Sequence, residues 1–162
     1  MRPPAPSRRT LLAAGAAALL IAALAIVLLT RGGDDGDPAD RYAATWQRAC
    51  QQLRADARRT TAAVERAGGG SAARGPVGAW LRRTAATLAT LQRADPPDRW
   101  RPYHRRAAVS LADARRQVEA LRAPVARGRL GALARLDLDR VAATPEAPAD
   151  LRRRTPACVA GR

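Results

Sequence analysis

The chain has 162 residues, a net charge of +15 and an apolar fraction of 47%, but no Phe and only 3% aromatic residues. The length leaves room for one domain of ordinary size beside a membrane anchor. The apolar residues are mostly Ala, Leu and Val, which favours closely packed helices over a sheet. All 29 basic residues are Arg. A GC-rich genome explains the choice of Arg over Lys, but the excess positive charge attracts anions in either case.

Residues 11–29 form an unbroken apolar segment, LLAAGAAALLIAALAIVLL. A helix of this length spans ~28 Å, close to the hydrocarbon thickness of a bilayer, and it lacks the polar face of a soluble core helix. Three arginines precede the segment, whereas one arginine and three aspartates follow it. By the positive-inside rule, residues 1–10 stay in the cytoplasm and the chain beyond position 30 is exported. We therefore predict a single-pass membrane protein with a Gly/Asp linker at 30–37.

Two features leave the processing of this segment open. Ala23 and Ala25 are small residues at which a signal peptidase could cut, although the next four residues are still apolar. The Arg8–Arg9 pair resembles a twin-arginine export signal, which would change the export route but not the side of the membrane that is reached. We predict an uncleaved signal anchor, with residues 38–162 as an extracytoplasmic domain.

The exported part has the spacing of amphipathic helices separated by glycine and proline. Apolar residues recur at helical spacing in four stretches, the last of them weaker: 38–67, 76–94, 100–124 and 130–141. No stretch alternates as a strand would. We predict an all-α fold, in which a small up-and-down bundle of about four helices is followed by a Pro-rich tail from Pro145 that packs on it without a long helix.

The two cysteines, Cys50 and Cys158, both follow the predicted membrane segment. In an exported protein such a pair indicates a disulfide, while two buried thiols or bridges between molecules are the alternatives. A bond between them would close a loop of over a hundred residues. It would also pin a tail that has few backbone hydrogen bonds of its own.

The sequence contains no recognisable set of catalytic or metal-binding residues. The single histidine, His104, lies beside two arginines, and no Cys or His pair has the spacing of zinc ligands. Nucleophile-elbow and Walker A motifs are absent from the sequence. Trp46, Trp80 and Trp100 could form a ligand cage, but each lies on an apolar stripe and is better explained as a core anchor. We therefore predict no enzyme, no cofactor and no metal site.

The positive charge is the remaining functional candidate. Residues 38–162 contain 25 arginines and 11 acidic residues. Arginine runs would attract anionic lipid head groups or acidic polymers of the cell envelope, whereas nucleic acid is not expected outside the cytoplasm. These runs comprise Arg82, Arg83, Arg105, Arg106, Arg152, Arg153 and Arg154. The competing interpretation is a solvated surface that only reflects composition.

We expect a non-catalytic interaction or structural module at the membrane, and electrostatic anion binding is the alternative function. Three features support a resemblance: a first helix with Tyr42 and Cys50, the turn LQRADPP at 91–97, and Cys158 near the C-terminus. With these features the chain resembles uncharacterised exported, membrane-anchored helical proteins of high-GC Gram-positive bacteria. The resemblance implies a helical bundle and a disulfide but no activity or protein partner. The Pro-rich stretch before Cys158 departs from it.

Tags at the two ends of the chain test the predicted topology. A tag after Arg162 should be digested by protease added to intact spheroplasts, because the chain beyond position 30 is expected outside the cytoplasm. A tag before Arg2 is the matched control and should be digested only after the membrane is broken. The reverse pattern would contradict the predicted orientation.

Overall fold

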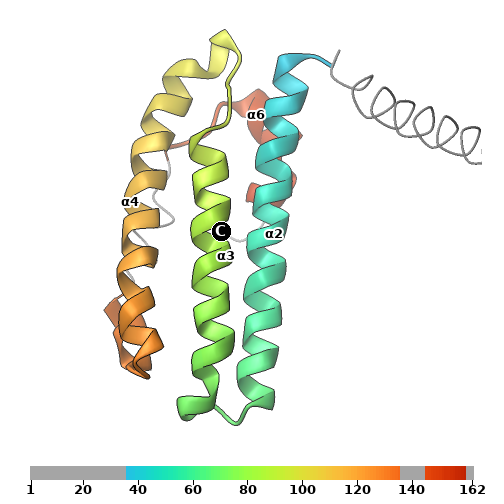
Figure 1. Ribbon diagram of the computed structural model, residues 1–162. Coiled ribbons are helices and arrows are strands. Elements are labelled where there is room, and N and C mark those ends of the chain that lie inside the picture. The colour runs from blue at the N-terminus through green and yellow to red at the C-terminus, as the bar shows by residue number, and fades with distance from the viewer. Residues whose placement is uncertain (1–35, 136–144, 160–162) are drawn as a thin grey trace, which may run out of the picture. The chain divides into compact units, whose positions relative to one another are not determined.

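The computed structural model describes residues 36–135 and 145–159, and every regular element in this part of the chain is helical. Three long helices run side by side in alternating directions (Figure 1): α2 (Pro38–Arg66), α3 (Arg74–Gln92) and α4 (Arg101–Ala126). The middle helix, α3, packs against both of the others. The predicted all-α bundle is confirmed for these residues.

Short helical turns connect and cover the long helices. The 3-10 turns η1 (Gly70–Ala73) and η2 (Asp98–Trp100) lead into α3 and α4, and η3 (Leu130–Arg135) follows α4. Two short helices, α6 (Ala149–Arg154) and α7 (Pro156–Val159), form the tail. Both pack against α2.

The described residues form three long helices, where about four were predicted. The described part of the expected fourth helix is only η3, and residues 136–144 lie outside the described residues. The tail contains two short helices and, within residues 145–159, no long one, as its prolines predicted. Pro145, Pro148 and Pro156 lack the backbone N–H groups that a long helix would need.

Glycines end two of the long helices near the predicted positions. Gly68 and Gly69, which follow α2, both have φ of 72°, and Gly128, which follows α4, has φ of 80°. These left-handed conformations are strained for residues with a Cβ atom. The N–H of Gly69 donates to the carbonyl oxygen of Val64 at 3.1 Å, which caps the last turn of α2.

The buried core has an aromatic end, where α2 begins and α4 begins. The ring centroids of Tyr42 and Trp100 lie 5.5 Å apart, and those of Trp46 and Tyr103 lie 5.8 Å apart. Aromatic pairs at these distances contribute about 0.5–1.5 kcal/mol each beyond the area they bury. Trp46 and Trp100 are buried core anchors, as predicted, whereas Trp80 is half-buried at the edge of the core.

His104 belongs to this aromatic end. Its Nδ1 atom lies 3.0 Å from the hydroxyl oxygen of Tyr42, and the two rings meet edge to face. Burial raises the pKa of Tyr42 above its ordinary value and that of Tyr103 to about 12, so both hydroxyls stay protonated at neutral pH. Across the described ranges, no three His, Cys, Asp or Glu side chains group as metal ligands would.

No helix within residues 36–135 or 145–159 is long and apolar enough to cross a membrane. The predicted membrane segment, 11–29, and the predicted cytoplasmic residues 1–10 lie outside the described residues, as does most of the linker at 30–37. The chain divides into two compact units between Asp37 and Pro38, and the bundle is the second of them.

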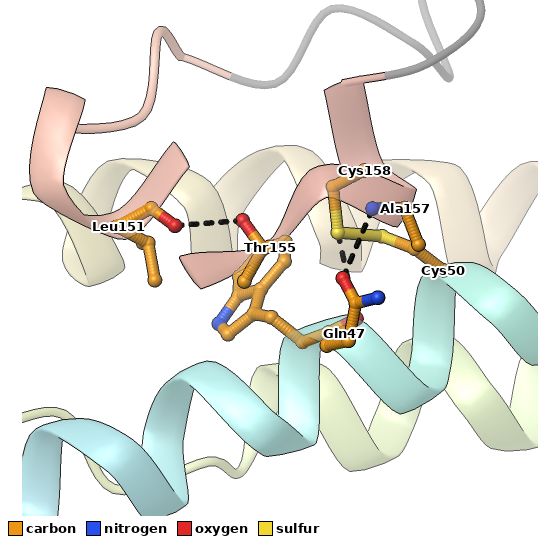
Figure 2. The surroundings of a disulfide bond; sticks show 7 residues. Gln47, Cys50, Leu151, Thr155, Ala157 and Cys158 are labelled. Carbon is orange, nitrogen blue, oxygen red and sulfur yellow. Dashed lines mark hydrogen bonds between the residues drawn. A yellow bond between two sulfur atoms is a disulfide. The ribbon is translucent and has the colours of Figure 1, made fainter. Parts of the chain in front are cut away.

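The predicted disulfide is present and joins the middle of α2 to the tail (Figure 2). The Cα atoms of Cys50 and Cys158 lie 5.2 Å apart, although the residues are 108 positions apart in sequence. Beside the bond, the N–H of Ala157 donates to Oε1 of Gln47 at 3.0 Å. The tail is thus attached to α2 by one covalent bond and by a hydrogen bond next to it.

The tail also covers the aromatic end of the core. The indole N–H of Trp100 donates to Oδ2 of Asp150 at 3.1 Å, and Arg154 forms an ion pair with Asp40 of α2. Leu151 of α6 is fully buried, with 1% of its surface exposed. Burial of the tryptophan and tyrosine rings therefore depends on the tail staying in place.

Removing the disulfide should destabilise the whole bundle. Cys50→Ser should lower the free energy of unfolding by about 2–5 kcal/mol, because a closed loop of this length restricts the unfolded chain. Calorimetry or circular dichroism should then show a Tm lower by on the order of 10 °C. Cys158→Ser and the reduced wild-type protein are the controls and should melt at the same temperature as Cys50→Ser. Free thiols in the protein from its native compartment would contradict the bond.

Candidate anion-binding cleft

A cleft of about 720 Å³ lies between the first half of α3 and the second half of α4. Arg74 and Arg82 line it from α3, and Arg122 and Glu119 line it from α4. The two helices run antiparallel, so the start of α3 lies beside the end of α4 (Figure 1). This places the cleft at the end of the bundle opposite Pro38.

The cleft is open because the residues between its arginines have little or no side chain. Gly75 and Gly78 line it from α3, and Ala123 and Ala126 line it from α4. A Cβ atom at Gly75 would have no neighbour within 4 Å, and one at Gly78 would meet only Nη1 of Arg82, at 3.9 Å. Packing against other elements therefore does not require either glycine, although Pro76 favours a residue without a side chain before it in a helix. Gly78 lies inside α3, where a glycine costs about 0.5–1 kcal/mol relative to Ala, so it keeps the cleft open at the expense of helix stability.

The charge of the cleft is positive. Arg74, Arg82 and Arg122 are exposed, and none of them forms an ion pair within the described part of the chain. Glu119 is matched by Arg115, with 3.5 Å between its Oε1 atom and the Nε atom of the arginine. Guanidinium groups present planar pairs of N–H donors that fit the oxygens of phosphate or carboxylate. The cleft can therefore bind anions.

The lining residues supply little for catalysis. Among the described residues, the cleft is lined by arginines, alanines, two glycines and one glutamate, with no hydroxyl, thiol or imidazole. A covalent mechanism would use such a nucleophile. The arrangement suits binding.

The predicted arginine runs do not all contribute to this cleft. Arg82 lines it, but Arg105 and Arg106 are exposed on the first half of α4. In the run on α6, the first and last arginines are paired with acidic side chains and Arg153 is exposed. The seven residues thus lie on three elements and have different surroundings.

Arg74 and Arg122 were not predicted, because neither of them has an adjacent arginine in the sequence. Adjacent residues on a helix point ~100° apart, whereas residues four apart lie on one face. Arg74, Gly78 and Arg82 follow that second spacing. The recurrence of arginine and glycine at every fourth position is therefore the sequence pattern that indicates the α3 side of the cleft.

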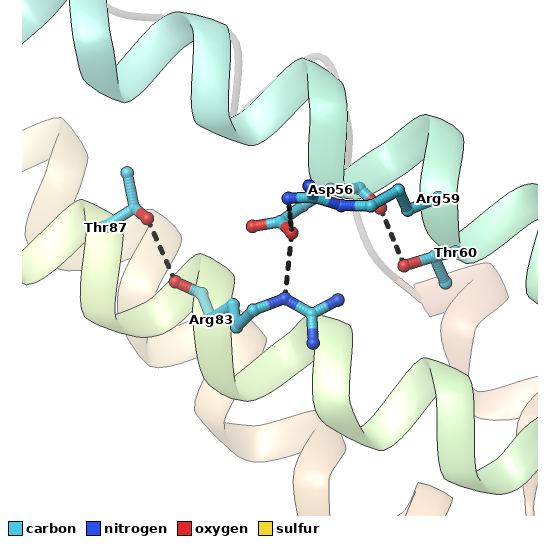
Figure 3. Close-up of polar contacts among 5 residues, drawn as sticks. All are labelled: Asp56, Arg59, Thr60, Arg83 and Thr87. Atoms are coloured by element: carbon cyan, nitrogen blue, oxygen red, sulfur yellow. Dashed lines mark hydrogen bonds and ion pairs between the residues drawn. The ribbon is translucent and has the colours of Figure 1, made fainter.

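Arg83, the neighbour of Arg82, points toward α2 and contacts a buried carboxylate (Figure 3). Asp56 of α2 is 1% exposed, and its Oδ1 atom accepts hydrogen bonds of 2.9 Å from Arg83 and from Arg59. The first bond joins α3 to α2, and the second lies within α2. Leu53 and Ala57 continue the helical spacing of apolar residues in this stretch, but Leu53 is half-buried and Ala57 is exposed.

The pair of arginines keeps Asp56 ionised. Burial acts to raise the pKa of this carboxyl, but the hydrogen bonds and charges of Arg59 and Arg83 outweigh burial and hold the pKa below its ordinary value. The ionised carboxylate therefore stabilises the folded state at neutral pH. We interpret Arg83 as a structural residue and not as part of the anion-binding surface.

No protein-family model, curated protein or solved structure matches this chain. The resemblance to exported bacterial proteins stays an expectation from the sequence. The cleft itself is the basis for the function proposed below.

Asp56→Asn should lower the free energy of unfolding at pH 7 by about 1–3 kcal/mol, because it removes a charged acceptor that joins two helices. The pKa of Asp56 is lower in the folded protein than in the unfolded chain, where it is ~3.9. The wild type therefore has this stabilisation in full above the unfolded pKa, and loses it as the pH falls through the pKa of the folded protein. The difference between the two proteins should therefore shrink on acidification, as urea titrations at several pH values would show. Asp113→Asn, which removes a more exposed partner of Arg116, is the control and should have little effect.

Proposed function

We propose that the bundle is a non-catalytic module that binds anionic groups of the cell envelope through the cleft between α3 and α4. The observation that carries the proposal is the grouping of Arg74, Arg82 and Arg122 around a floor of glycine and alanine. The ligand chemistry is a phosphate or carboxylate group, from a lipid head group or from an acidic polymer. Residues 11–29 would hold the module at the extracytoplasmic face of the membrane.

The strength expected of such a site is modest. An arginine close to an anionic surface contributes about 1 kcal/mol, so three contribute on the order of 3 kcal/mol. Because the side chains are exposed, salt at physiological concentration screens much of this attraction over ~8 Å. Useful binding therefore requires a ligand that is abundant or that offers several anionic groups at once.

Two variants with the same net charge distinguish the cleft from the general arginine excess. The cleft variant changes Arg74, Arg82 and Arg122 to Gln. The control changes Arg105, Arg106 and Arg153 to Gln, three exposed arginines outside the cleft lining. The test is elution of the full-length proteins from phosphocellulose in neutral detergent. The cleft variant should elute at a lower salt concentration than the control. Equal elution of the two would refute the cleft as the binding site and favour a structural or protein-interaction role.

A further inference from the structure

We infer that the cleft binds a linear polyanion, in which anionic groups repeat along a chain, and not a single small anion or the head groups of a bilayer. This inference rests on the proposed anion-binding function and specifies its ligand. The spacing of the charges and the shape of the cleft support it.

The arginines of α3 are too far apart to share one small anion easily. Arg74 and Arg82 are eight residues apart on one face, which is ~12 Å along the helix axis. Nη1 of Arg82 lies 3.9 Å from the Cβ position of Gly78, so this side chain extends toward the start of α3. Helical side chains generally tilt in that direction, so we expect Arg74 to tilt in parallel and the two charges to stay separate. Arg122 adds a third charge from α4.

The volume and the floor of the cleft suit an extended ligand. The cleft measures about 720 Å³, whereas a water molecule takes ~30 Å³ in the liquid, so several ionic groups and the chain that links them have room. The floor between the arginines consists of Gly75, Gly78, Ala123 and Ala126, and no large side chain interrupts it. A chain can therefore lie along the helices while its anionic groups reach successive guanidinium groups.

The recessed shape of the cleft favours a polymer over a bilayer. Its floor of glycine and alanine lies between two helices, where one extended chain can enter, whereas the head groups of a bilayer present a flat surface.

Competition at equal phosphate-group concentration tests the inference directly. Full-length protein in neutral detergent is bound to fluorescent linear polyphosphate and then titrated with unlabelled polyphosphate, inorganic phosphate or micelles doped with phosphatidylglycerol. We expect unlabelled polyphosphate to compete at least about tenfold better, per phosphate group, than either alternative, because several groups of one chain bind together. Equal competition by inorganic phosphate, or better competition by the lipid, would overturn the inference and leave anion binding intact.

Charge and shape variants then locate the binding. The cleft variant should bind polyphosphate on the order of a hundredfold more weakly at low salt, and its slope of log affinity against log salt should fall by about 2–3, whereas the Arg105, Arg106 and Arg153 control should bind nearly as the wild type does. Equal losses in the two variants would overturn the proposed function together with the inference.

Gly75→Leu fills the cleft without changing any charge. It should stay folded, because nothing outside the adjacent residues lies within 4 Å of the Cβ position. A side chain before Pro76 disfavours helix, and this offsets the gain from replacing glycine. We expect it to weaken polyphosphate binding by about tenfold while inorganic phosphate binding stays unchanged. Ala62→Leu, an exposed change on α2, is the control for added apolar surface. Unchanged polyphosphate binding in Gly75→Leu would show that the chain does not lie in the cleft and would overturn the inference.

Discussion

The central position of α3 is the constraint on which the rest of the bundle depends. This helix packs against α2 on one side and α4 on the other, and its buried residues are medium-sized or small. Its two consecutive arginines therefore have separate roles: Arg83 reaches the buried Asp56 of α2, and Arg82 borders the cleft beside α4. Because a helix turns ~100° per residue, one position of difference in sequence decides between a structural bond and an exposed charge.

The two ends of the bundle are built differently. At the Pro38 end, aromatic rings fill the core and the disulfide-linked tail covers them, so this end is well packed. At the other end, glycine and alanine leave the space between α3 and α4 open, and exposed arginines surround it. The destabilisation by the glycines at one end is small compared with the stabilisation by the aromatic rings and the disulfide at the other.

The sequence predicted the helices and the disulfide well, because both leave local signals. Glycine and proline mark helix ends, and two cysteines that both follow a predicted membrane segment indicate a disulfide between them. Asp56 was missed because a charged residue was not expected on a buried face, and its partner Arg83 was assigned to the anion-binding surface. Arg122 could not be placed beside Arg82 without the antiparallel packing of α3 and α4, since they are forty positions apart in sequence.

The bond between Cys50 and Cys158 has a consequence for what happens when a protease cuts the backbone. A single backbone cut at any point between these two positions leaves both pieces covalently attached, because the bond bridges 108 positions. The cut halves of the bundle would stay at high effective concentration and could reassociate through the same core. Such a nicked molecule would run as one band on a non-reducing gel and separate into two fragments only after reduction.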